Sequence, residues 1–144
     1  MEIRKKIEKE TALKEIQEIK TKLIGENILD VLDSDEVLKE IENVQPGKYL
    51  LAAVMSGLVY YDDDKKCLIQ EFVKPVQSGE QTAENLMFKN NLTLGYMREE
   101  NTSNEIALTI NLVTRLTGKT KQLIEKIYGQ DLKVLQDIIT FFYA

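Results

Sequence analysis

The sequence predicts an α+β protein in which about three antiparallel strands are packed by C-terminal helices and preceded by an N-terminal helical extension. Three observations carry this prediction. Apolar residues recur at three- and four-residue steps over residues 3–24, strand-type residues over 48–89 are interrupted by short polar turns, and helical spacing returns over 103–142. The order of the chain is therefore helix, sheet and helix.

The first 45 residues are predicted to be helical. Isoleucine and leucine at helical spacing predict a first helix that ends near Ile24, before a glycine. A second helix is expected from Asp33, because Glu36 stands three residues later, as in a capping box. The Pro-Gly pair that follows is a strong break. We therefore expect an N-terminal helical extension at residues 1–45 and an α+β domain at 46–144.

Residues 48–89 are predicted to form the sheet. The first strand, KYLLAAVMSGLVYY at 48–61, is apolar on both faces, and the same run also fits a buried helix, so the two alternatives stay open. The second and third strands are expected at 67–76 and 82–89. Pro75 has no backbone N–H, so it is expected at a strand end or at a sheet edge.

The remaining residues are predicted to form three short helices. Ser103 or Asn104 caps the first, which ends at Gly118. Thr120 caps a second, and Asp131 opens the last. The last helix is apolar around much of its circumference, so it must be buried by more than one neighbour.

The composition argues against catalysis and metal binding. The 144 residues contain no histidine and one cysteine, Cys67, which removes Ser-His and Cys-His nucleophile pairs and zinc sites. The acidic run at 62–64 is followed at once by two lysines, which favours a hairpin turn over a cation site. We expect a protein that is not an enzyme, binds no metal and needs no cofactor.

The charge and the N-terminus bear on partners and location. A net charge of −5 without a clustered basic surface argues against nucleic acid as a partner. The N-terminus lacks the apolar core of a signal peptide, and the longest apolar run, 49–61, is too short to span a bilayer as a helix. These features predict a cytoplasmic protein that does not associate with membranes.

The chain from Cys67 to its end resembles tail assembly chaperones of long-tailed bacteriophages, and two stretches carry the resemblance. The first, EFVKPVQSGEQTAENLMF at 71–88, has a Lys-Pro strand, a glycine turn and a second strand. The second, at 112–142, has a Leu-Thr-Gly helix end, a short helix, an aspartate that opens the last helix and a terminal phenylalanine pair. The resemblance covers about half of the chain and its motifs are mainly structural. It implies a chaperone in the host cytoplasm that binds the tape-measure protein, with no catalytic residue.

The sequence and the resemblance together favour a protein-binding function. A different adaptor or regulatory subunit of bacterial or phage origin is the alternative, and an enzyme or small-ligand binder is a third hypothesis. We expect a long helical client, or a second copy of the chain, to dock on the last helix. The predicted docking residues are Leu132, Leu135, Ile139, Phe142 and Tyr143.

Overall fold

The computed structural model describes residues 7–24, 46–90 and 105–143, and these form an α+β fold, as the sequence predicts. The second helix expected from Asp33 lies outside the described residues. The helices are α1 (Lys9–Ile24), α4 (Lys48–Met55), α6 (Glu105–Thr117), α7 (Lys121–Ile124) and α8 (Gly129–Phe142), and the strands are β1 (Val59–Asp62), β2 (Cys67–Ser78) and β3 (Gln81–Phe88).

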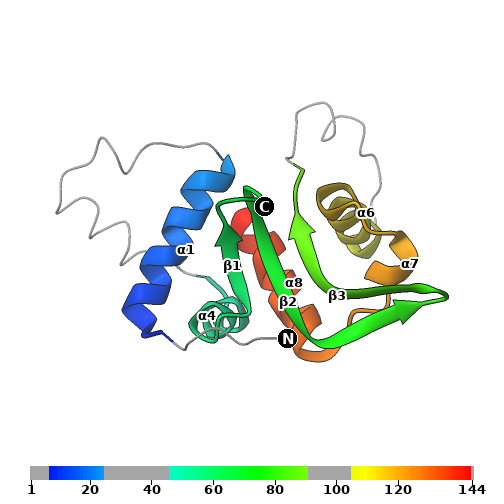
Figure 1. The fold of residues 1–144 in the computed structure, drawn as a ribbon, viewed down its shortest axis with the longest axis horizontal. Helices are drawn as coiled ribbons and strands as arrows, with labels where there is room; N and C mark the ends of the chain where they lie inside the picture. Colours follow the sequence, from blue (N-terminus) through cyan, green and yellow to red (C-terminus); the bar gives the residue numbers. More distant parts are fainter. Residues whose placement is uncertain (1–6, 25–45, 91–104, 144) are drawn as a thin grey trace.

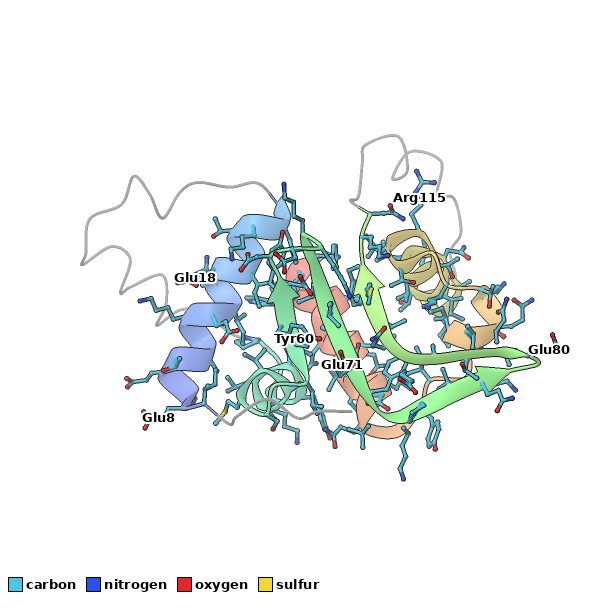
Figure 2. All side chains as sticks on the ribbon, viewed as in Figure 1. Glu8, Glu18, Tyr60, Glu71, Glu80 and Arg115 are labelled. Atoms are coloured by element: carbon cyan, nitrogen blue, oxygen red, sulfur yellow. The ribbon has the colours of Figure 1, made fainter. Side chains whose placement is uncertain are left out.

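The three strands form an antiparallel sheet in the order β1-β2-β3. Alternate side chains face the hydrophobic core, and the helix α8 crosses this face, behind the strands in Figure 1. On the other face, Tyr60 Oη donates a hydrogen bond of 2.7 Å to Glu71 Oε1 (Figure 2). The sheet residues in the core are Val59, Leu68, Phe72, Val76, Ala83, Leu86 and Phe88.

The apolar run 48–61 is divided between a helix and a strand, so neither of the two open alternatives describes its whole length. Residues 48–55 form α4, and only the end of the run enters β1. Three apolar side chains of α4 are buried at helical spacing: Leu50, Ala53 and Val54. Gly57, at a φ of 78°, makes the turn between helix and strand.

The start of α4 is capped from a distant helix. Asp137, on α8, accepts hydrogen bonds of 3.1 Å from the backbone N–H groups of Tyr49 and Leu50. These N–H groups have no partner within their own helix. A Cβ atom at Gly47 would overlap the Asp137 carboxylate, so this close approach requires glycine. The cap therefore fastens α4 to α8.

A break in the β2–β3 ladder is held by a second aspartate of α8. Residues 72–75 of β2 stand opposite the single residue Glu84, and Pro75 lies in this irregular segment. It is not at a strand end, but it lies beyond the residues of β2 that pair with β1, where one side of β2 is an edge, as the second alternative predicted. Asp131 Oδ1 and Oδ2 accept hydrogen bonds of 2.8 Å from the backbone N–H groups of Val73 and Lys74. Asp131 was predicted to open the last helix, but α8 begins two residues earlier, at Gly129.

The N-terminal helix α1 shares the core with the rest of the fold. Ala12, Ile16 and Ile19 are buried in the same hydrophobic cluster as α4 and the sheet. Before the helix, the Ile7 N–H donates to the Met55 carbonyl at 2.9 Å. In its last turn, Lys22 forms an ion pair of 3.1 Å with Asp63 in the β1–β2 turn. Figure 1 shows α1 beside β1, at the opposite side of the sheet from α6.

Candidate functional site

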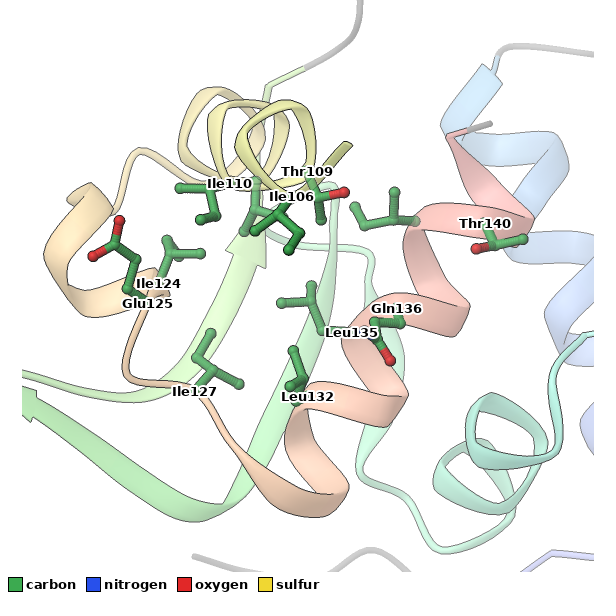
Figure 3. Close-up of a pocket in the computed structure, with 12 residues that line it drawn as sticks. Ile106, Thr109, Ile110, Ile124, Glu125, Ile127, Leu132, Leu135, Gln136 and Thr140 are labelled. Atoms are coloured by element: carbon green, nitrogen blue, oxygen red, sulfur yellow. The ribbon is translucent and has the colours of Figure 1, made fainter. Parts of the chain in front are cut away.

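An apolar groove lies between α6 and α8, with α7 closing one end (Figure 3). Its volume is about 570 Å³. Eight of its twelve lining residues are aliphatic, and Glu125 is the only charged one. Ile106, 73% exposed, and Leu132, 36% exposed, stand at its rim. The lining residues are Ile106, Thr109, Ile110, Val113, Ile124, Glu125, Ile127, Leu132, Leu135, Gln136, Ile139 and Thr140.

Two separate sets of contacts position the walls of this groove. The wall formed by α8 is fixed to the sheet through Asp131 and to α4 through Asp137. The wall formed by α6 is fixed at its C-terminal end, where the Asn90 N–H donates to the Leu116 carbonyl at 3.1 Å. The Asn90 side chain also donates to the Arg115 carbonyl at 2.8 Å. The two walls are therefore held by different elements: α8 by the sheet and α4, and α6 by Asn90, just after β3.

The short helix α7 forms the closed end. Thr120 caps it as predicted, accepting a hydrogen bond of 3.4 Å from the Leu123 N–H. Gly118, at a φ of 72°, ends α6 as predicted and allows the sharp turn into α7. As a result, Ile124 and Ile127 reach the groove beside the aliphatic side chains of α6 and α8.

The structure divides the five predicted docking residues into two groups. Leu132, Leu135 and Ile139 line the groove. Phe142 is 4% exposed and belongs to the core, and Tyr143 stacks on Phe88 of β3 with 5.9 Å between ring centroids. We therefore place the candidate site at the first three residues, and the docking role itself stays a prediction.

The C-terminal aromatic residues pack back onto the fold. The rings of Phe141 and Phe142 meet edge to face at 5.1 Å between centroids. The Lys20 ammonium of α1 lies 4.9 Å from the centre of the Phe141 ring. The Tyr143 hydroxyl is buried and has no hydrogen-bond partner within the described part of the chain. The end of α8 is thus covered by α1 and β3, whereas the middle of α8 faces the groove.

Burial of Tyr143 gives the stability of the fold a dependence on alkaline pH. Desolvation raises the pKa of Tyr143 well above its ordinary value, and Cys67 adds a smaller contribution in the same direction. Above about pH 10 the unfolded chain releases this proton while the folded chain keeps it, so the free energy of unfolding falls.

Tyr143→Phe is expected to make this fall less steep in urea denaturation between about pH 9 and pH 11. Tyr128→Phe, at an exposed tyrosine, is the control. Identical slopes for Tyr143→Phe and the wild type would contradict the assignment.

The acidic run and the cysteine have structural roles. Asp62 Oδ1 accepts 2.9 Å hydrogen bonds from the N–H groups of Asp64 and Lys65, which forms the predicted hairpin turn. Cys67 is fully buried, as expected of a structural thiol, and burial raises its pKa, with a smaller contribution from Asp62. Within residues 7–24, 46–90 and 105–143, no cluster of three or more Cys, Asp or Glu side chains is placed to hold a metal ion.

The α6 wall was missed as part of the site by reasoning from sequence. Ile106, Ile110 and Val113 recur at helical spacing, and this is also the pattern of an ordinary core helix. The same spacing recurs in α8, and only the four-residue helix α7 separates the two. The available signal was this order along the chain: two helices with apolar faces, separated by one short helix.

Comparison of the chain with protein-family models, with curated proteins and with solved structures gives no match. The resemblance to tail assembly chaperones therefore stays a prediction. Among the helices that the structure describes, none has the length and apolar character needed to cross a bilayer.

Proposed function

We propose that this protein is a non-enzymatic binding protein that holds an apolar segment of another protein in the groove between α6 and α8. The observation that carries the proposal is the groove's chemistry: eight aliphatic side chains line an open hollow of about 570 Å³, with one charged residue. Grooves of this kind between helices bind amphipathic helices through side chains spaced three or four residues apart. The lack of histidine throughout the sequence supports a role without acid–base catalysis at neutral pH.

The resemblance at residues 71–88 and 112–142 makes the tape-measure protein of a long-tailed phage the proposed client. The first stretch covers most of the β2–β3 hairpin, and the second contains α7, α8 and, of the groove residues on α6, Val113. In this proposal the groove covers apolar stripes of the long helical client until tail-tube subunits assemble around it. An acidic protein with a net charge of −5 suits this role, because net charge helps to keep a chaperone–client complex soluble.

A substitution at the groove rim tests the proposal. Leu132→Lys places a charge on a 36% exposed side chain of the groove, so we expect the fold to survive and client binding to weaken at least about tenfold. Val73→Lys is the matched control, because Val73 is 42% exposed and lies on β2, outside the groove. Binding is measured by co-expression with a long helical protein encoded by a neighbouring gene, followed by co-purification and titration.

The outcomes separate the hypotheses. Equal client binding by both variants would show that the groove is not the docking site. Groove-dependent binding of a client that is not a tape-measure protein would favour the alternative, a different protein-binding adaptor. No interaction with the neighbouring gene product would contradict the tail-chaperone assignment.

A further inference from the structure

A second hollow adjoins the groove on the other side of Leu132. It has a volume of about 550 Å³ and lies between α4 and the first turn of α8. Its lining residues are Tyr49, Ala52, Gly129, Gln130, Leu132 and Lys133. Leu132 lines both hollows, so it forms the ridge where they meet. Tyr49 and Leu132, each 36% exposed, continue the apolar surface from the groove toward α4.

The two hollows differ in charge. Glu125 is the one charged residue that lines the groove, whereas Lys133, of the opposite charge, lines the second hollow. Beside it, the Lys48 ammonium lies 5.2 Å from the centre of the Tyr49 ring. Neither lysine forms an ion pair within the described part of the chain. The nearby Asp137 carboxylate is occupied by the backbone N–H groups that begin α4.

We infer that the groove and the second hollow form one continuous docking surface for an amphipathic helix with an acidic end. The aliphatic stripe of this helix fills the groove and crosses Leu132. Its carboxylates then lie over the second hollow, where Lys48 and Lys133 supply complementary charge. The inference rests on the proposed function and deepens it by defining the chemistry of the bound segment.

Electrostatics decides in favour of an acidic rather than a basic end. Lysines of the partner placed over the second hollow would be repelled by the ammonium groups of Lys48 and Lys133. The nearby carboxylate that could attract them, Asp137, already accepts two backbone hydrogen bonds. Partner carboxylates would meet two cations at the rim, where solvent screens the attraction but does not remove it. Exposed pairs of this kind change affinity modestly, so the expected effect is a preference and not an absolute requirement.

Three synthetic helical peptides provide the probe. Each is about 20 residues and about 30 Å long, with the same leucine stripe at three- and four-residue steps. They differ only at one end, which carries three glutamates, three glutamines or three lysines. Fluorescence anisotropy with the full chain is expected to rank the glutamate peptide first, about three- to tenfold tighter than the glutamine peptide. The preference is expected to shrink at high salt.

Charge reversal on the protein completes the test. The double variant Lys48→Glu/Lys133→Glu is expected to lose the preference for the glutamate peptide and to favour the lysine peptide. Lys9→Glu/Lys14→Glu, which makes the same charge change on exposed residues of α1, is expected to behave as the wild type. Equal affinities for the glutamate and glutamine peptides, or loss of the preference in the α1 control, would overturn the inference.

The failure of this inference and that of the proposed function are distinguishable. Client binding that depends on Leu132, without any charge preference among the peptides, leaves the proposed function standing and rejects the acidic end. Failure of every peptide to bind, with groove-dependent client binding, rejects an isolated amphipathic helix as the occupant. A dimer of this chain that Leu132→Lys dissociates would identify a second copy as the occupant and would also overturn the inference.

Discussion

Replacing Asp131 with alanine is expected to lower the free energy of unfolding by about 2–3 kcal/mol. The Asp131 carboxylate is buried, at 3% exposure, and accepts two backbone hydrogen bonds of 2.8 Å, from Val73 and Lys74. Hydrogen bonds to a charged group are stronger than those between neutral groups, and alanine leaves both N–H groups without their acceptor. Partial exposure of Val73 lets water replace some of this loss, which limits the effect. Urea denaturation followed by circular dichroism measures the change.

Two matched variants make this prediction specific. Asp131→Asn keeps one acceptor oxygen, so its free energy of unfolding is expected to lie between those of the wild type and of Asp131→Ala. Asp63→Ala removes an exposed carboxylate that makes a single ion pair, and its cost is expected to stay below about 1 kcal/mol. In hydrogen exchange, the Val73 and Lys74 amides should exchange slowly in the wild type and fast in Asp131→Ala. Equal stability of Asp131→Ala and Asp63→Ala would show that the hydrogen bonds of Asp131 do not stabilise the break in the β2–β3 ladder.

The elements that were predictable from sequence are those with a local signal. The helix α6 was found from its spacing and from Gly118, which adopts the positive φ that ends it. The β2–β3 hairpin was found from a glycine turn, and α7 from Thr120. The run at 48–61 was harder, because an unbroken apolar segment has no period that separates a buried helix from a strand.

The roles of Asp131 and Asp137 were not predictable, because each acts on backbone far away in the sequence. Asp131 was assigned to the start of its own helix, where an aspartate usually caps, but its carboxylate reaches β2. Pro75 gave a partial indication of this contact. A proline inside a strand interrupts the ladder, so neighbouring backbone N–H groups need another acceptor. The sequence does not show which residue supplies that acceptor.

Only part of the candidate site was predictable from sequence, because the rest depends on contacts between distant elements. The apolar circumference of α8 indicated an extra neighbour, and Leu132, Leu135 and Ile139 do line the groove. The sequence did not reveal that α1 and β3 already cover the end of α8, so Phe142 and Tyr143 were included. Which part of an apolar helix is left uncovered depends on packing between elements that are distant in the sequence. The position of α6 as the second wall of the groove also depends on that packing.

The second large effect is expected at Ile16 in α1. Ile16 is fully buried among residues of the core cluster, so Ile16→Ala removes three carbon atoms from a closely packed site. Substitutions of this type cost about 2–5 kcal/mol, depending on how far the cavity collapses. We expect the free energy of unfolding to fall by about 2–4 kcal/mol, measured by urea denaturation. Glu18→Ala, on the exposed face of the same helix, is expected to change it by less than about 0.5 kcal/mol.

The same variant tests whether α1 behaves as part of a separate extension, which the sequence predicted for residues 1–45. Circular dichroism follows the helices. Tyrosine fluorescence follows the six tyrosines of a chain without tryptophan; none lies in α1, and three of them, Tyr60, Tyr61 and Tyr143, lie in β1 and at the end of α8. If α1 is an integral part of the core, both signals shift together to lower urea in Ile16→Ala, because a two-state fold loses all its elements in one transition. If α1 unfolds independently, the helical signal shifts alone and the tyrosine transition stays where it is in the wild type. The contact of Ile7 with Met55 and the Lys22–Asp63 ion pair fasten α1 at both ends, which favours the single transition.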